Sequence, residues 1–195
     1  MYADSASVLL DSIQAPDELT DKDFAHWCML CGKVTDEAAT GLLPIYQWQR
    51  AQQWFTEHGT AEEQAQIDLY LGRAYVEDGE YDKAMQIYAD ALQLAKEHQA
   101  YNVAGYICAY MADLYGFRDI TSECLKKREE ACEFFKKAEN YKSYAYSLKD
   151  LAGEWAILDS FACTIPLLQK ADSISQLLHN KNLTAAIANA FALIY

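Results

Sequence analysis

The stretch from residue 65 to residue 95 decides how this chain folds. It reads AQIDLYLGRAYVEDGEYDKAMQIYADALQLA. Good helix formers such as Ala, Leu, Gln and Lys stand on both sides of its centre, and no β-branched run alternates as in a strand. Gly79 and its acidic neighbours mark a turn over residues 77–82. The stretch therefore predicts two antiparallel helices joined by a short turn.

The same pattern returns every 40 residues. Small residues define units that start at Ala25, Ala65, Gly105, Ala145 and Ala185. A second column of small residues lies seven positions later, at Gly32, Gly72, Ala112, Ala152 and Ala192. Further columns share a residue type: Ala51, Ala91, Ala131 and Ala171; Ile45, Met85, Leu125 and Ile165; Trp54, Leu94, Phe134 and Ile174. Agreement at this many columns without a gap indicates an internal repeat.

The columns have a direct physical meaning. Small residues let two helix backbones approach, and large apolar side chains fill the space around that contact. One helix pair cannot bury its apolar face alone, so stacked pairs bury it against each other. The sequence therefore predicts an all-α chain. Residues 1–24 form an N-terminal capping helix and lead-in, and residues 25–195 form the repeat array, with a partial unit from residue 185.

The second unit resembles the tetratricopeptide repeat. The residues that mark this family stand at Leu71-Gly72-x-x-Tyr75, Gly79, Tyr81, Ala84, Tyr88 and Ala91. The resemblance extends from Phe24 to Tyr195 and implies a right-handed α-solenoid of antiparallel helix pairs. Tetratricopeptide units usually have about 34 residues, whereas HEAT and armadillo units have about 40–47. The residue pattern, rather than the length, favours a 40-residue tetratricopeptide variant.

Longer tetratricopeptide units occur in bacterial sensor-regulators and motor light chains. Residues 4–13, DSASVLLDSI, are similar to the openings of bacterial tetratricopeptide lipoproteins and membrane-anchored regulators. The resemblance implies a protein- or peptide-binding scaffold, the interaction or sensory segment of a larger bacterial protein. The alternatives are an extracytoplasmic lipid-anchored adaptor and the non-catalytic part of an enzyme whose active domain lies outside this chain.

Local signals place several helix ends. His58-Gly59 has the pattern of a helix end with a glycine C-cap, and Thr60-x-x-Glu63 has that of a capping box. Pro44 and Pro166 fall near the starts of second helices, where proline is tolerated in the first turn. Because Pro166 lies two positions later in its unit than Pro44, we expect a local irregularity there.

The chain is strongly acidic, with a net charge of −13 and a pI of about 4.6. An acidic surface repels phosphate backbones and anionic lipids, so we expect no direct nucleic-acid partner. No apolar run reaches the roughly 18 residues of a membrane span. The compartment stays open between the cytoplasm and a periplasmic or membrane-anchored location in the full-length protein.

The motif Cys28-x-x-Cys31 suggests a redox or zinc site. A zinc site needs two more ligands, and no second Cys-x-x-Cys or His-x₃-His accompanies it. The repeat gives another explanation, because Cys28 and Cys108 share a column and Cys31 takes the column of Leu71 and Met111. We therefore expect these cysteines to act as small buried apolar residues, with no metal site and no disulfide framework.

Catalytic motifs are missing from the sequence. Nucleophile elbows, P-loops, Gly-rich dinucleotide turns and His-Glu-x-x-His do not occur. His58 and His98 share a column near the end of a second helix, where positive charge suits the helix dipole. We therefore expect no catalytic residue, no cofactor and no enzyme activity in this chain.

The family resemblance also implies where a ligand binds. In tetratricopeptide arrays the first helix of each unit lines the concave surface, and unit positions 2, 5, 6 and 9 tend to face it. Here these positions are rich in tyrosine, a common binding anchor. The predicted groove residues are His26, Lys33, Gln66, Tyr70, Arg73, Tyr106, Tyr110, Asp113, Tyr146 and Lys149, with Asp150 beside them. They predict a site for a protein or peptide.

Lys33 and Arg73 are two cations at the same position of adjacent units. They suit a carboxylate of an extended peptide. The resemblance to the carboxylate-clamp arrays of chaperone adaptors is partial, because the paired asparagines of those arrays are missing. The alternative is that the two cations pair with Asp36, Glu37 or Glu77, one turn away.

The last six residues, AFALIY at 190–195, are apolar and have no partner helix in the sequence. Solenoids need a polar cap. We expect the native chain to continue past Tyr195, and the alternative is end-to-end self-association through residues 185–195.

Overall fold

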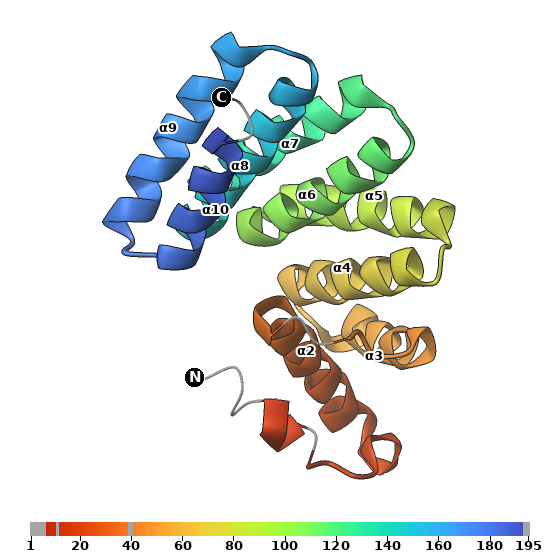
Figure 1. Cartoon of the computed structure of the whole chain (residues 1–195). Coiled ribbons are helices and arrows are strands. Elements are labelled where there is room, and N and C mark those ends of the chain that lie inside the picture. The colour runs from red at the N-terminus through yellow and green to blue at the C-terminus, as the bar shows by residue number, and fades with distance from the viewer. Residues whose placement is uncertain (1–6, 11, 39–40, 193–195) are drawn as a thin grey trace. The chain divides into compact units, whose positions relative to one another are not determined.

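The structure is a computed structural model. It describes residues 7–10, 12–38 and 41–192, except for the side chains of residues 36–38. All regular secondary structure in these ranges is helical, and no strand occurs in them (Figure 1). The predicted all-α class is confirmed.

The helices follow one another as first and second members of antiparallel pairs (Figure 1). The first helices are α2 (Asp21–Ala38), α4 (Ala61–Glu77), α6 (Tyr101–Phe117), α8 (Tyr141–Ile157) and α10 (Lys181–Ala192). The second helices are α3 (Ile45–His58), α5 (Tyr81–Glu97), α7 (Thr121–Lys137) and α9 (Phe161–Leu177). A short 3-10 helix, η1 (Pro16–Glu18), precedes α2, and residues 7–10 are also helical.

The 40-residue spacing is visible in the helix bounds. First helices begin at residues 21, 61, 101, 141 and 181. The unit starts chosen from the small residues lie four residues inside these helices. The boundary drawn at residue 24 therefore falls within α2, and the division of the chain at that point stays a prediction.

The six turns from α4–α5 to α9–α10 share one backbone closure. The second residue after each helix has a positive φ, between 51° and 79°; these residues are Gly79, Gln99, Asp119, Glu139, Asp159 and His179. The next amide donates to a carbonyl five residues back, at 2.9 Å both for Glu80 to Tyr75 and for Ser160 to Trp155. This is the Schellman motif, which favours glycine. Five of the six turns use another residue, at a conformational cost.

The chain divides inside α6 into two compact units, Met1–Val103 and Ala104–Tyr195. In the first unit, α3 packs against α2 and α4, and α5 packs against α4. The side chains of Trp48, Tyr70 and Tyr88 lie fully inside its core. The rings of Trp48 and Tyr70 are 5.3 Å apart.

Two glycines allow this aromatic packing in the first unit. A Cβ on Gly32 would overlap the ring of Tyr70, and a Cβ on Gly72 would overlap the ring of Tyr88. The predicted column of small residues therefore does bring elements close together. At these positions the close neighbour is an aromatic ring rather than a second backbone.

The second unit packs its helices in the same order. Helix α8 packs against α7 and α9, and α10 packs against α9 and α8. A Cβ on Gly105 would lie 2.7 Å from the ring of Phe135. Five alanines of the repeat columns are fully buried in this unit, namely Ala112, Ala131, Ala145, Ala152 and Ala171, whereas Ala185 and Ala192 of α10 are exposed.

The predicted helix ends are mostly confirmed. Helix α3 ends at His58, and Thr60 with Glu63 forms the capping box of α4, with Thr60 N donating to Glu63 Oε2 at 2.9 Å. Pro44 is the N-cap residue of α3. Pro166 lies inside α9, which has 17 residues like its neighbours and continues through the proline without a break. The expected irregularity at Pro166 is therefore absent from the helix bounds.

Most cysteines are core residues, as predicted. Cys28, Cys108, Cys124 and Cys132 are buried, Cys31 is half-buried, and Cys163 is exposed. Burial raises the pKa of Cys132 to about 12 and that of Cys28 further, so both thiols stay protonated at neutral pH. Within the described ranges, no three His, Cys, Asp or Glu side chains gather as a metal site.

Candidate binding site

The predicted groove residues of the second unit form a half-buried stripe on its first helices. Tyr106, Tyr110 and Asp113 are spaced four and three residues apart on α6, and Tyr146 and Lys149 lie on α8. All five side chains are half-buried. This spacing places each set on one face of its helix, so the exposed parts of these side chains can contact one partner together.

The structure brings some of these side chains into contact with others. The hydroxyl of Tyr106 lies 2.8 Å from that of Ser143, which joins α6 to α8, and its ring lies edge-on to Phe135. Asp113 accepts a hydrogen bond from Arg128 of α7 at 2.6 Å. Lys149 pairs with Asp150 at 2.6 Å. The stripe is therefore linked by polar contacts rather than freely hydrated.

In the first unit one predicted residue does not belong to the surface. Tyr70 is 0% exposed, because it fills the space above Gly32 and packs on Trp48, so its assignment to the groove is corrected. His26 and Lys33 are exposed, and Gln66 and Arg73 are half-buried.

The surroundings of His26 and Arg73 are partly aromatic. The ring of His26 lies edge-on to Trp54 at 5.0 Å, and its Nδ1 is 2.7 Å from the carbonyl of Lys22. The guanidinium of Arg73 lies 5.9 Å from the Tyr70 ring. That Lys33 and Arg73 jointly hold a carboxylate stays a prediction.

Arg128 breaks a core column. The corresponding residues of the other units are Trp48, Tyr88 and Leu168, which are 1% exposed or less. The Arg128 side chain is also largely buried, at 12% exposure. Because a buried charge requires a partner, a column of aromatic and aliphatic residues that contains one arginine indicates a local specialisation.

Glu154 on α8 is the second departure from the repeat. Its column contains Val34, Ala74 and Leu114 in the other units. Arg128 donates to Glu154 Oε1 from both Nε and an Nη, each at 3.4 Å, and to Asp113 Oδ1 at 2.6 Å. An ion-pair cluster from three helices therefore replaces apolar packing.

The pKa values of Asp113 and Arg128 in this cluster are shifted by different causes. Burial raises the pKa of Asp113 above its usual range, and this outweighs the opposing effect of Arg128. Burial alone would lower the pKa of Arg128, but Asp113, Asp150 and Glu154 together raise it. The guanidinium therefore stays charged, and it is surrounded by carboxylates.

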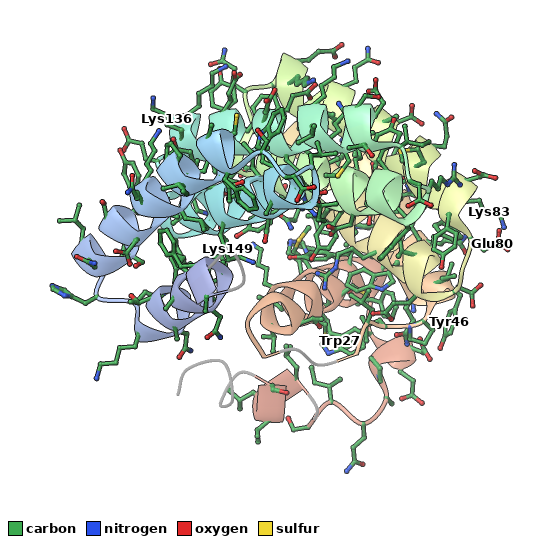
Figure 2. The ribbon with its side chains drawn as sticks, turned by 45° about the horizontal axis from the view of Figure 1, so that its top comes forward. Trp27, Tyr46, Glu80, Lys83, Lys136 and Lys149 are labelled. Carbon is green, nitrogen blue, oxygen red and sulfur yellow. The ribbon has the colours of Figure 1, made fainter. Side chains whose placement is uncertain are left out.

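An open pocket of about 590 Å³ lies beside this cluster in the second unit. It is lined by Arg128, Lys149, Asp150, Ala152, Gly153, Glu154, Ala156, Ile157, Asp159, Phe161, Thr164, Leu168 and Ala190. Figure 2 labels Lys149, which comes from α8. A Cβ on Gly153 would have nothing within 4 Å, so the glycine leaves the space above α8 open.

Sequence reasoning missed Arg128, Glu154 and Gly153. The signal was available in the columns, because each differs in type from its counterparts in the other units. Lys149 was predicted and lies at the pocket. The pocket combines an apolar floor with charged side chains at its lining, as ligand pockets commonly do.

Comparison with solved structures defines the fold. The chain matches the aspartyl phosphate phosphatase F of Bacillus subtilis with a TM-score of 0.77 at 10% identity over 90% of this chain. It matches the TPR-like repeats of a putative kinesin light chain from Podosopora anserina with a TM-score of 0.58 at 13% identity, covering 93% of this chain and 90% of that one. The chain has a tetratricopeptide-like helical repeat fold.

The apo form of RapI is also similar, with a TM-score of 0.68 at 15% identity over 93% of this chain and 72% of that one. The chain spans only 46% of the length of the Bacillus phosphatase. No family model and no curated protein sequence matches the chain. None of the helices in the described ranges is long and apolar enough to cross a membrane.

Proposed function

We propose that this chain is a protein- or peptide-binding scaffold that uses the exposed faces of its first helices. The observation that supports it most is the stripe on α6 and α8, where three tyrosines and Lys149 stay half-exposed and Lys149 also lines an open pocket. Tyrosine offers a large rigid contact area together with a hydroxyl, which suits binding anchors. The chain contains no catalytic motif that competes with this function.

In the first unit we propose a second contact region at Lys33 and Arg73. Two cations on neighbouring first helices suit a carboxylate of an extended peptide. Lys33 is exposed, and the side chains of its acidic neighbours Asp36 and Glu37 lie outside the described residues. Reversal of both charges, in Lys33→Glu with Arg73→Glu, should then weaken binding of peptides that depend on a carboxylate.

We also propose that the chain is the interaction or sensory segment of a larger bacterial regulator. The similarity in fold to the Bacillus phosphatase is the observation behind this proposal. A lipid-anchored adaptor or the non-catalytic part of an enzyme would use the same surfaces. The alternative of self-association through residues 185–195 involves residues that lie partly outside the described ranges.

The scaffold is tested by selection of peptides from a random phage-displayed library on the immobilised chain, followed by calorimetric titration. The test variants are Tyr146→Ala and Lys149→Glu. The matched controls are Tyr141→Ala, from the first turn of α8 and off the stripe, and Lys136→Glu, from the exposed side of α7 (Figure 2). Selected peptides should bind the controls as the wild type and bind the test variants about tenfold more weakly. Failure to select any binding peptide would refute the scaffold.

A further inference from the structure

We propose that the pocket beside Arg128 binds a partner segment that presents a Lys or Arg next to an apolar side chain. This inference rests on the proposed scaffold function and names the chemistry of one ligand. It follows from three properties of the pocket: an apolar floor, a net negative lining, and charges that folding does not require.

The apolar part of the pocket can take one or more aliphatic side chains. Ala152 and Leu168 form buried floor, and Ile157 and Phe161 stand at the rim with 78% and 43% of their surface exposed. A volume of about 590 Å³ lies within the range of ligand pockets, about 300–1,000 Å³. A partner that covers exposed Ile and Phe side chains beside a pocket buries apolar surface, which lowers the free energy of the complex.

The charged part of the lining favours a cation. The pocket is lined by Asp150, Glu154 and Asp159 against Arg128 and Lys149, which leaves one net negative charge. Both cations already bind carboxylates of the protein itself.

An anionic ligand would have to displace those internal carboxylates. A ligand cation, by contrast, meets an excess of carboxylates. The net charge of −13 on the whole chain would also attract a basic partner.

The ion pairs of this site are not needed to build the fold. The other units pack Trp48, Tyr88 or Leu168 where the third has Arg128, and Val34, Ala74 or Leu114 where the fourth has Glu154. Buried ion pairs are often no more stable than the apolar packing that replaces them. Their presence beside an open pocket therefore points to recognition.

Gly153 allows a clean test of the pocket. A side chain at this position meets no neighbour at its Cβ, so Gly153→Trp should fold and fill the pocket mouth. Gly153→Ala is the matched control, because it also replaces the helical glycine but adds no bulk, although Ala favours a helix more than Trp does. Circular dichroism and thermal unfolding check that both variants are folded.

The probes are three short dye-labelled peptides in a Gly-Ser background, measured by fluorescence anisotropy with the full chain. One has Leu-Lys-Leu at its centre, the second has Glu in place of Lys, and the third has Ser in place of both Leu. We expect the first peptide to bind about tenfold more tightly than either of the others, and more weakly at high salt. Gly153→Trp should abolish this binding, and Gly153→Ala should retain it.

The charge preference is tested separately with Glu154→Gln combined with Asp159→Asn. We expect the preference for Lys over Glu in the peptide to fall by about tenfold. Equal binding of the three peptides, or binding that Gly153→Trp leaves intact, would overturn the proposal. Self-association of the wild type that Gly153→Trp removes would also overturn it, because the occupant would then be a second copy.

Failure of the pocket and failure of the scaffold give different results. If phage-selected peptides bind and are weakened by Tyr146→Ala while the Leu-Lys-Leu peptide does not bind, the scaffold stands and the pocket proposal falls. If no selected peptide binds at all, the scaffold itself falls.

Discussion

The α4–α5 pair and the α8–α9 pair place a carboxylate in the core in two different ways. Both pairs have 17-residue helices and the same turn closure. In α4 the carboxylate is Asp68, in a column that otherwise contains Cys28, Cys108 and Leu148. Asp68 accepts a hydrogen bond from Gln52 at 2.6 Å, and burial raises its pKa to about 6. Because its hydrogen-bond partner Gln52 is an uncharged amide, the Asp68 carboxylate takes up a proton at a higher pH than an ordinary aspartate.

In α8 the carboxylate is Glu154, and its partner is the guanidinium of Arg128. Asp113, Asp150 and Glu154 raise the pKa of Arg128, so the guanidinium of this cluster stays charged at neutral pH. The comparison teaches that this backbone accepts a charged residue in an apolar column with either solution. Only the second solution leaves fixed charges beside an open pocket.

The largest expected effect is on the ion-pair cluster. Arg128→Ala should lower the free energy of unfolding by about 3 to 4 kcal/mol, because Asp113 and Glu154 lose their partner in a partly buried site. Urea unfolding followed by circular dichroism measures this.

The matched control replaces the pair rather than breaking it. Arg128→Leu with Glu154→Leu restores the apolar columns of the other units and should be within about 1 kcal/mol of the wild type or more stable. If the single and double variants lose the same free energy, the cluster is a structural requirement and the contrast with α4 is wrong.

The next effect concerns Gly72 in α4. Gly72→Ala should destabilise the chain by about 2 to 3 kcal/mol, since its Cβ would overlap the buried ring of Tyr88. The corresponding residue of α8 is already Ala152, opposite the smaller Leu168. Tyr88→Leu, which copies Leu168 of α9, should therefore reduce the penalty of Gly72→Ala in the double variant. Additive free-energy losses in this cycle would contradict the assigned contact.

Asp68 should make stability depend on pH. Its folded pKa of about 6 exceeds the ordinary 3.8, so the folded state binds the proton more tightly. The contribution of Asp68 to stability is then most favourable below about pH 4, falls as pH rises to about 6, and levels off above. Asp68→Asn should remove this slope and gain about 2 kcal/mol at about pH 7.5. A slope that persists in Asp68→Asn would assign the pH dependence to another group.

The smallest effects are expected at two of the shared turns, at Gly79 between α4 and α5 and at Asp159 between α8 and α9. Gly79→Ala should cost about 1 kcal/mol, because Gly79 has a φ of 79°, whereas Asp159→Gly should stabilise by about 0.5 to 1 kcal/mol, because Asp159 has a φ of 55°. Thermal unfolding of the two single variants measures both. Effects of the same sign would show that the turns are not equivalent.

Much of the fold was predictable because the columns repeat without gaps. The 40-residue spacing, the turn at Gly79, the capping box at Thr60 and the burial of Cys28 all depend on local patterns that sequence displays directly. The turn residues other than glycine were not predictable in this way. Residues such as Glu139 give no signal for a left-handed backbone by their type, although their turns have the same closing hydrogen bonds as the turn at Gly79.

The candidate site was harder to predict. Family positions placed Tyr70 on the surface, but the glycine of a neighbouring helix lets its ring enter the core. Columns that keep one residue type lie in the core. The columns of Arg128, Glu154 and Gly153 change type at the pocket, and this signal was missed. The groove assignments of the remaining residues await binding measurements.

The shared turn closure has a consequence for how such a chain can change in length. Because every turn from residue 79 to residue 179 repeats the same hydrogen bonding at intervals of 20 residues, removal or duplication of any 40-residue block in this region joins two ends of identical geometry. Recombination within such a gene would then produce longer or shorter proteins without a new loop. A block containing Arg128, Gly153 and Glu154 would carry the proposed binding pocket with it, as a module that can be moved.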